Sequence, residues 1–263
     1  RGCAAGKVGQ DRRRRRVDPR ARPVEAAAVT SVLTDWDVRV EVDAALRGQA
    51  SDPDEMRRRR PEIVGATAAA VREARTLIAP LVLSRRLAVR SHAPDALELE
   101  TGRLECGAWA AGRLKEAREV MAVVCTIGHA LEARVNAVFP SDPAKALALD
   151  GAGSAAVDAL AAEACERFRR ESAARGLPGT VQCWPGSTAW STEAGQPLIF
   201  GLVDPDGREA DRVRLLPSRL IKPVKSVAFL LGLTARATAP EHQCESCSLA
   251  AVCRHRPRAR RPR

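Results

Sequence analysis

Three cysteines near the end of the chain are the residues best suited to chemistry: Cys244, Cys247 and Cys253. Two cysteines with two residues between them can hold one metal ion through local folding of the backbone, and the third thiolate lies within loop reach. A tetrahedral site needs a fourth ligand. The candidates are His242, His255, and from the body of the chain Cys106 or Cys183. The spacing fits an iron-sulfur cluster and a zinc ion equally, and we expect one of the two.

A second candidate site is the segment Cys183-Trp184-Pro185-Gly186-Ser187, which Trp190 follows closely. A Pro-Gly pair forms a tight turn that exposes backbone amides and lets a ligand approach. The indoles of Trp184 and Trp190 offer flat faces for a ring. The alternative is a Trp-lined turn that only caps the core, and the residues taken alone favour that alternative.

The third candidate is the segment from Lys222 to Ser226. The chain has five lysines against 38 arginines, and two of the lysines, Lys222 and Lys225, lie here. The ammonium of Lys225 and the hydroxyl of Ser226 could hold a carboxylate or a phosphate, although a solvated loop is the commoner explanation of such a segment. We find no P-loop, HExxH motif or Ser-His-Asp order, which argues against a conventional hydrolase.

The longest amphipathic pattern of the chain, residues 146–172, predicts a helix, and we expect this helix to position the candidate residues. One face is apolar and comprises Val157, Leu160, Ala161, Ala164, Cys165 and Phe168. The run of small residues at 151–156 matches the dinucleotide fingerprint Gly-x-Gly-x-x-Ala. That fingerprint needs a buried strand before it, and the alanine-rich residues 143–149 favour a helix instead. We therefore expect the run to be a seam of close packing.

The rest of the chain mixes helices and strands without a regular alternation, which predicts an α+β fold. Pro61 begins a helix that ends before Pro80, and a helix follows Gly128. We expect strands at 97–101, 121–127, 197–203 and 213–216, and more weakly at 29–42. Residues 51–54 and 217–226 are expected to be loops, and 204–207 a turn that joins two strands.

Charge is concentrated at the two ends of the chain, whose net charge is +11. Residues 1–22 carry eight Arg, one Lys and two Asp, and residues 254–263 carry six Arg, so the part between them is close to neutral. We expect a disordered basic tail at 1–22, one domain at 23–240, and a cysteine cluster with a basic tail at 241–263. The four Phe, four Trp and absence of Tyr argue against nucleic-acid binding by the body. No segment is apolar enough for a signal peptide or a membrane span, so we expect a cytoplasmic protein.

Five short motifs in order support a family resemblance. They are Thr126-Ile-Gly128 with Leu131-Glu132, residues 149–154, Trp184-Pro185-Gly186, Gln196 with Ile199-Phe200, and Pro223-Val-Lys225-Ser226. Together they span residues 61–233 and resemble the activation domain of cobalamin-dependent methionine synthase, especially its free-standing relatives. Those relatives also end in a cysteine cluster followed by a basic residue, as Cys253 and Arg254 do here.

The resemblance implies an α+β fold with a curved antiparallel sheet, and a groove that binds S-adenosylmethionine. The implied cofactor-binding residues are Trp184, Pro185, Gly186, Ser187, Lys225 and Ser226. It also implies a role in reductive methylation of cobalamin held by a partner, either a corrinoid protein or a cobalamin-dependent methyltransferase.

In the family's motif an Arg stands three residues before the Pro-Gly pair and a Tyr stands just after it. This chain departs from the family at both places. Gln182 and Ser187 occupy those places, and loss of the Arg predicts weakened binding of the methionine carboxylate, by about one to two decades. The leading expectation is an accessory protein for reductive activation of a corrinoid-dependent methyltransferase. The alternative is a non-catalytic module that binds a corrinoid protein and holds a structural zinc. A third hypothesis, that the chain is a nucleic-acid-binding protein, is supported only by the Arg-rich tails.

Overall fold

The protein is described by a computed structural model that covers residues 30–186 and 190–237. The helices are α1 (Val42–Gly48), α2 (Pro53–Arg59), α3 (Pro61–Arg75), α4 (Gly107–Arg113), α5 (Ala130–Val138), α6 (Pro143–Ala173) and α7 (Thr192–Val203). The strands are β1 (Ser31–Leu33), β2 (Leu81–His92), β3 (Leu97–Leu99), β4 (Gly102–Leu104), β5 (Ala117–Thr126), β6 (Gly179–Cys183), β7 (Arg214–Leu215), β8 (Ile221–Lys222) and β9 (Ser226–Thr234). The expected tails at 1–22 and 241–263 lie outside the described residues.

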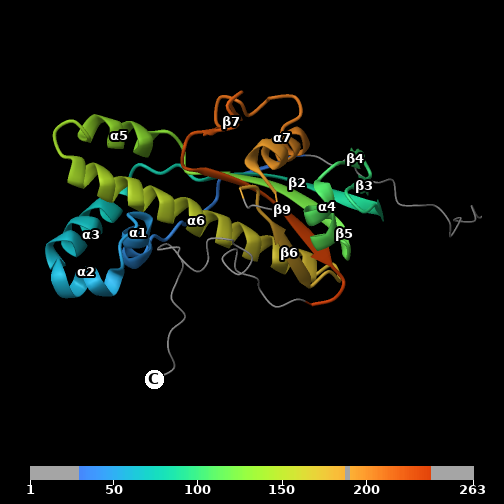
Figure 1. Ribbon diagram of the computed structural model, residues 1–263, viewed down its shortest axis with the longest axis horizontal. Helices are drawn as coiled ribbons and strands as arrows, with labels where there is room; N and C mark the ends of the chain where they lie inside the picture. Colours follow the sequence, from blue (N-terminus) through green and yellow to red (C-terminus); the bar gives the residue numbers. More distant parts are fainter. Residues whose placement is uncertain (1–29, 187–189, 238–263) are drawn as a thin grey trace, which may run out of the picture.

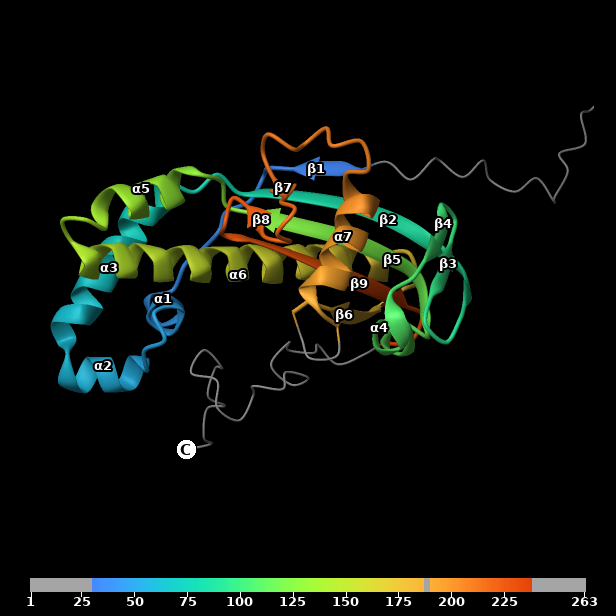
Figure 2. The same ribbon diagram turned by 45° about the horizontal axis from the view of Figure 1, so that its top comes forward.

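Seven strands form one antiparallel sheet in the order β4-β3-β2-β5-β9-β6, and β1 joins it by pairing with β2. The long central strands β2, β5 and β9 carry most of the pairing, with Leu81 opposite Thr126 and Thr126 opposite Ser226. The sheet curves along its length (Figure 2). A separate two-stranded ribbon joins β7 and β8. The expected α+β fold with a curved antiparallel sheet is therefore confirmed.

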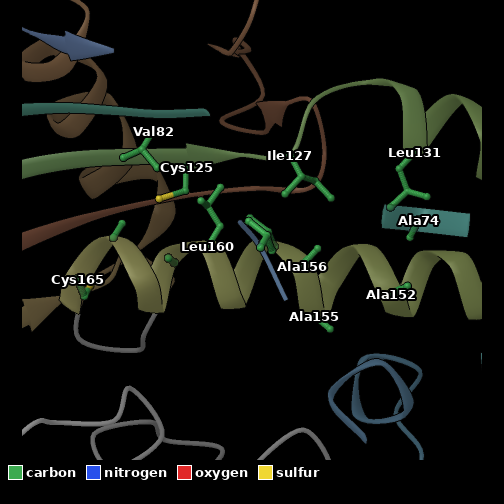
Figure 3. Close-up of a cluster of buried hydrophobic side chains, with 14 of the residues drawn as sticks. Ala74, Val82, Cys125, Ile127, Leu131, Ala152, Ala155, Ala156, Leu160 and Cys165 are labelled. Carbon is green, nitrogen blue, oxygen red and sulfur yellow. The ribbon is translucent and has the colours of Figure 1, made fainter. Parts of the chain in front are cut away.

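Helices cover both faces of the sheet, and the sheet separates the hydrophobic core into two layers (Figure 1). The long helix α6 lies across one face, with α1, α3 and α5 packed around its first half. Helices α4 and α7 cover the other face. On the α6 side, Leu160 points toward Cys125 of β5, and small side chains such as Ala156 let the helix approach the sheet (Figure 3).

The predicted seam of small residues is a crossing of α1 over α6. A Cβ atom on Gly48 would stand 2.5 Å from the carbonyl oxygen of Gly151, and a Cβ on Gly151 would stand 2.6 Å from that of Ala45. The close-packing prediction is confirmed, since real Cβ atoms do not approach a carbonyl so closely. The helix runs unbroken from Pro143, so no strand precedes Gly151 and the dinucleotide fingerprint does not apply.

A charged cluster ties three of these helices together. Glu73 of α3 accepts from Arg134 of α5 at 2.6 Å, and Lys145 of α6 lies 2.9 Å from the same carboxylate. Hydrogen bonds from Lys145 and Arg134 lower the pKa of Glu73. The carboxylate therefore stays charged and links α3 to α5 and α6 through two ion pairs.

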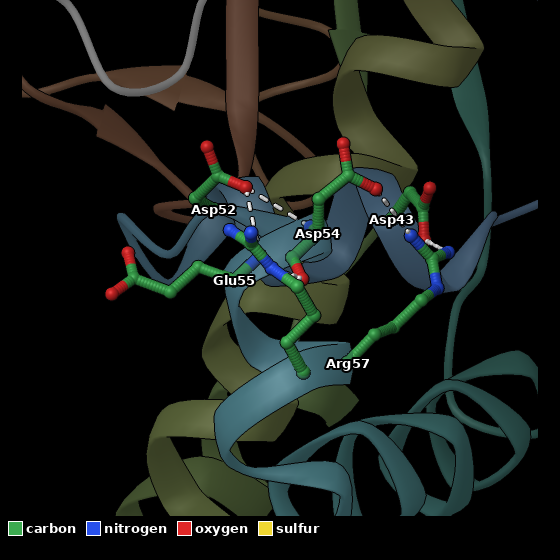
Figure 4. A network of polar contacts seen from close by, with 6 residues as sticks. Asp43, Asp52, Asp54, Glu55 and Arg57 are labelled. Carbon is green, nitrogen blue, oxygen red and sulfur yellow. Dashed lines mark hydrogen bonds and ion pairs between the residues drawn. The ribbon is translucent and has the colours of Figure 1, made fainter.

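The N-terminal helices differ from the sequence prediction. Residues 31–33 form the expected strand, but residues 42–48 turn into α1, and the expected loop at 51–54 begins α2. Asp52 caps α2 by accepting from the backbone N–H groups of Asp54 and Glu55, at 3.0 and 3.1 Å (Figure 4). Arg57 then pairs with both Asp54 and Asp43, so that α2 is bound to α1.

The predicted strand at 197–203 is wrong, because this segment belongs to helix α7. Ser191 caps the helix, and its buried residues Gly195, Ile199 and Val203 are spaced four apart on one face. Thr30 and Arg85 donate to the carbonyls of Val203 and Leu202 at the other end. Asp204 and Gly207 form the predicted turn, which leads out of a helix rather than joining two strands.

The other predicted elements are found. They are the helices at 61–75, 130–138 and 143–173 and the strands at 97–99, 117–126 and 214–215. Strand β6 and the short β8, inside the expected loop 217–226, were not predicted. Within residues 30–186 and 190–237, no helix is both long and apolar enough to cross a bilayer.

Candidate functional site

The ends of β5 and β9 carry two hydroxyls that lock the following loop. Ser226 Oγ lies 2.6 Å from the carbonyl oxygen of Pro223 and 2.7 Å from Thr126 Oγ1. A carbonyl can only accept, so Ser226 donates to Pro223 and accepts from Thr126. Thr126 Oγ1 in turn accepts from the N–H of Gly128 at 3.2 Å. Both hydroxyls are engaged, which makes Ser226 a positioning residue for the 222–225 loop.

Lys225 is the most enclosed cation of this region, because its side chain is only 16% exposed. Its ammonium lies 2.8 Å from Asp150 Oδ1 and 2.9 Å from Ser154 Oγ, both on α6. Its methylene stem lies over Gly153, where a Cβ would stand 3.2 Å from Lys225 Cγ. The small residues of α6 thus create the space that holds Lys225, and its charge is already compensated by Asp150.

Lys222 and Glu132 attach the same loop to helix α5. Lys222 Nζ donates to Glu132 Oε1 at 2.6 Å, and the backbone N–H of Val224 donates to Glu132 Oε2 at 3.0 Å. Burial alone would raise the pKa of Glu132, but the bonds from Lys222 and Val224 outweigh burial and lower it. The carboxylate therefore remains ionised and fixes the loop that carries Lys225.

The Pro-Gly turn, residues 184–186, directly follows edge strand β6. The indole of Trp184 packs on Phe229 of β9 with ring centroids 4.2 Å apart, and its Nε1–H donates to Gln182 Oε1 at 3.0 Å. Gly186 has a φ of +103°, which favours glycine, and its N–H donates to the carbonyl of Trp190 at 2.8 Å. The turn therefore holds Trp184 in a defined orientation with its side chain half-buried.

The two predicted aromatic faces do not lie together. Trp184 packs with the core on the α6 side of the sheet, whereas Trp190 is buried on the α7 side, in the same hydrophobic cluster as Cys183. Neighbouring residues of a strand point to opposite faces, and Cys183 and Trp184 separate in this way. Trp184 is thus the indole that remains for a ligand, and Trp190 is a core residue.

The candidate residues nevertheless share one face of the sheet. Alternate residues of β9 and its approach, Lys225, Val227 and Phe229, face α6, and Trp184 lies against Phe229. Four residues of strand separate Lys225 from Phe229, a span of roughly 13 Å. Along this side of the sheet, which α6 covers, a compensated lysine lies at one end and a half-buried indole at the other. Ser187 lies outside the described residues.

The predicted metal ligands Cys244, Cys247 and Cys253 also lie outside the described residues, as do His242 and His255. Cys106 and Cys183, proposed as ligands from the body, are both buried. Burial raises the pKa of the Cys106 thiol, which disfavours the thiolate that a metal requires. Across the ranges that the structure describes, no three His, Cys, Asp or Glu side chains are placed to hold a metal ion.

Burial also makes the two cysteines of the α6 layer poor nucleophiles. It raises the pKa of Cys165 to about 12, and it raises the pKa of Cys125 strongly. Both thiols remain protonated at neutral pH and belong to the core shown in Figure 3. They take no part in the candidate site.

Sequence reasoning did not assign Asp150, Ser154 and Glu132 to the site, although all three fall within the motifs quoted above. Asp150 and Ser154 are four residues apart, which places them on one face of a helix. Their distance from Lys225 along the chain hid the contact. No local signal in the sequence joins these residues.

Comparison with known proteins finds similarity at the level of the fold. No protein-family model matches the sequence, and no curated protein matches it. Among solved structures, the chain is similar to the crystal structure of the MetH reactivation domain bound to AdoHcy. The TM-score is 0.60 with 12% sequence identity, and the match covers 83% of each chain. The expected activation-domain-like fold is confirmed.

Proposed function

We propose that this chain is an accessory protein for the reductive activation of a corrinoid-dependent methyltransferase such as methionine synthase, acting in the cytoplasm. The observation that carries the proposal is a fold shared with the MetH reactivation domain over 83% of both chains. The fixed positions of Lys225 and Trp184 on the α6 side of the sheet support it, because both residues fall within the motifs that carry the resemblance. Cobalamin would be held by the partner and not by this chain.

A ligand bound near Trp184 and Lys225 would be of the adenosyl type, S-adenosylmethionine or S-adenosylhomocysteine. The residues fit such a ligand only in part. The half-buried indole of Trp184 is suited to stacking with a purine, although one of its faces already packs on Phe229. Lys225 would have to release Asp150 before it could pair with a carboxylate. We therefore expect weak binding by the native chain.

Calorimetry with S-adenosylhomocysteine tests the ligand. The double variant Gln182→Arg, Ser187→Tyr is expected to bind about ten- to a hundredfold more tightly than the native chain, because a guanidinium can pair bidentately with the carboxylate. The matched control is Gln182→Leu, Ser187→Tyr, which removes the same acceptor from Trp184 but adds no charge. Equal, undetectable binding in all three proteins would remove adenosyl ligands from the proposal.

A reconstituted reaction tests the function itself. The cobalamin-binding part of a methionine synthase, without its own reactivation domain, would be mixed in the cob(II)alamin state with S-adenosylmethionine, an electron donor and this chain. We expect methylcobalamin to form at least tenfold faster with the chain than without it, as followed by the visible absorption spectrum. Unchanged spectra, together with no complex in sedimentation, would contradict the proposal.

The second candidate is a non-catalytic module that binds a corrinoid protein and contains a structural zinc site at Cys244, Cys247 and Cys253. It is favoured if the metal is redox-inert, because zinc has no accessible second oxidation state whereas an iron-sulfur cluster transfers single electrons. The sequence spacing that suggests a metal is the same for both functions.

Metal analysis of protein purified without oxygen separates the two functions. We expect near-stoichiometric metal that Cys247→Ala abolishes, because two of the three local thiolates are too few ligands. The control Cys165→Ala removes a buried core thiol and should leave the metal content unchanged. Iron with broad absorption supports the activation function, and colourless protein with zinc supports the module. If the native chain holds neither iron nor zinc, the cysteine cluster is irrelevant to both functions.

A further inference from the structure

We propose that the protein that carries the corrinoid docks on an exposed apolar patch beside the Lys225 loop. The patch consists of Phe139, Leu147 and Val224, and we call it the hairpin patch because two of the three residues belong to the α5–α6 hairpin. The inference rests on the proposed function, since it names the surface that the partner in that function would use.

The hairpin patch holds most of the large apolar side chains that the fold leaves in solvent. In the part of the chain that the structure describes, five such side chains are exposed, and Phe139, Leu147 and Val224 are three of them, at 61%, 54% and 52%. Single exposed apolar residues are ordinary. Several on one side of a molecule indicate a contact surface.

Helix periodicity places Phe139 and Leu147 next to the candidate site. Helices α5 and α6 are joined by residues 139–142 and lie side by side (Figures 1 and 2). Phe139 keeps helical backbone angles and follows Glu132 by seven residues, and Leu147 precedes Ser154 by seven. Residues seven apart share a helix face and lie roughly 10 Å apart. The two apolar residues therefore continue the faces of Glu132 and Ser154 toward the tip of the hairpin.

The loop at residues 222–225 joins these two helix faces. Glu132 of α5 accepts from Lys222 and from the backbone N–H of Val224. Ser154 of α6 lies 2.9 Å from the ammonium of Lys225. Because one loop contacts both faces, the faces lie on the same side of the molecule, and Val224 extends the patch from the hairpin onto the loop.

The charges beside the patch compensate one another. Lys222 pairs with Glu132 at 2.6 Å, and Lys225 pairs with Asp150 at 2.8 Å. These four charges sum to zero, so they give the patch no attraction for a nucleic acid or an anionic membrane. An apolar surface with compensated charges is suited to contact with another protein.

The size of the patch favours a partner that binds and leaves. Three half-exposed side chains supply on the order of a few hundred Å² of apolar surface, whereas each side of a stable complex buries about 800 Å². A permanent dimer would need a larger apolar face. A protein that delivers cob(II)alamin and departs with methylcobalamin needs only a transient contact, which a patch of this size can provide.

Glutamine substitutions test the patch. The double variant Phe139→Gln, Leu147→Gln should bind the cobalamin-binding part of a methionine synthase at least tenfold more weakly than the native chain, as measured by sedimentation, because a few apolar residues dominate the affinity of an interface. Val224→Gln should weaken binding as well. The matched control Val32→Gln changes an exposed valine of β1 and should bind as the native chain does. All four side chains are exposed, so melting temperatures should change by no more than a few degrees.

The reconstituted reaction separates docking from chemistry. The double variant should need at least tenfold more partner for half of its maximal rate, while the rate at saturating partner stays unchanged, because Trp184 and Lys225 are intact. If the native chain is active and the double variant binds equally well, this inference is wrong and the proposed function stands. A native chain that neither binds the partner nor forms methylcobalamin contradicts both.

Two further outcomes would overturn the inference alone. One is a loss of binding in Val32→Gln as large as in the double variant, since the effect would then not belong to the patch. The other is self-association of the native chain that the double variant abolishes, since a second copy would then cover the patch.

Discussion

Gly151→Ala is expected to lower the free energy of unfolding by about 2 to 3 kcal/mol, the range for overpacking at a tight contact. The added Cβ would lie 2.6 Å from the carbonyl oxygen of Ala45, and this backbone atom cannot rotate away as a side chain would. Helices α1 and α6 would have to separate. Urea unfolding followed by circular dichroism measures the change, and a melting temperature lower by roughly 5 to 10 °C should accompany it.

Gly65→Ala is the matched control, because Gly65 is also a glycine within a helix but has no atom within 4 Å of its Cβ position. Alanine favours a helix over glycine by about 0.5 to 1 kcal/mol, so this variant should be slightly more stable than the native chain. Similar stability changes for the two variants would show that α1 does not press on α6.

Trp184→Ala is expected to have the largest effect on ligand binding. In the background of Gln182→Arg, Ser187→Tyr, where affinity is measurable, loss of the indole should weaken binding of S-adenosylhomocysteine about tenfold or more, which is the contribution of one base stacked on an aromatic ring. The same change removes the contact with Phe229 and should destabilise the fold by about 2 kcal/mol, less than for a fully buried Trp. Calorimetry and urea unfolding measure the two effects separately.

Trp184→Phe separates stacking from general loss of structure. A phenyl ring keeps an aromatic face against Phe229, whereas the N–H that donates to Gln182 in the native chain is lost. We expect affinity within about threefold of the parent, since the stacking surface remains. Binding that is weakened equally by Phe and Ala would show that Trp184 acts through the fold and not through stacking, because the parent variant already lacks the Gln182 acceptor.

The strongly periodic segments were predictable from sequence because their patterns reflect one buried face. Helix α6 follows the apolar spacing of residues 146–172. Strand β5 was predictable for a different reason, since residues 121–127 are a continuous apolar run and the strand is buried on both faces. Helix α7 was not predictable in this way, because its apolar run 198–203 has no clear period and Pro197 opposes a helix. Capping at both ends by Ser191, Thr30 and Arg85 comes from tertiary contacts that local sequence does not reveal.

The candidate site was predictable in its residue types but not in its pairings. The turn after Trp184 and the lysines at 222 and 225 have local signatures. The partners of Lys225, however, are Asp150 and Ser154, more than 70 residues away. The separation of Trp184 from Trp190 could be inferred only after the position of β6 was known, because neighbouring residues of a strand point to opposite core layers.

The position of β9 has a consequence for how the chain folds during synthesis. Among the strands of the described residues this one comes last in sequence, yet it lies inside the sheet between β5 and β6. Thr126 of β5 lies 100 residues before its β9 partner Ser226, so the central pairing is strongly non-local and the sheet cannot be completed until residue 234 has left the ribosome. Until then β5 exposes an unpaired and largely buried-type edge, VMAVVCT, that can pair with another chain. Nascent or truncated forms that lack β9 should therefore aggregate rather than populate a smaller folded unit.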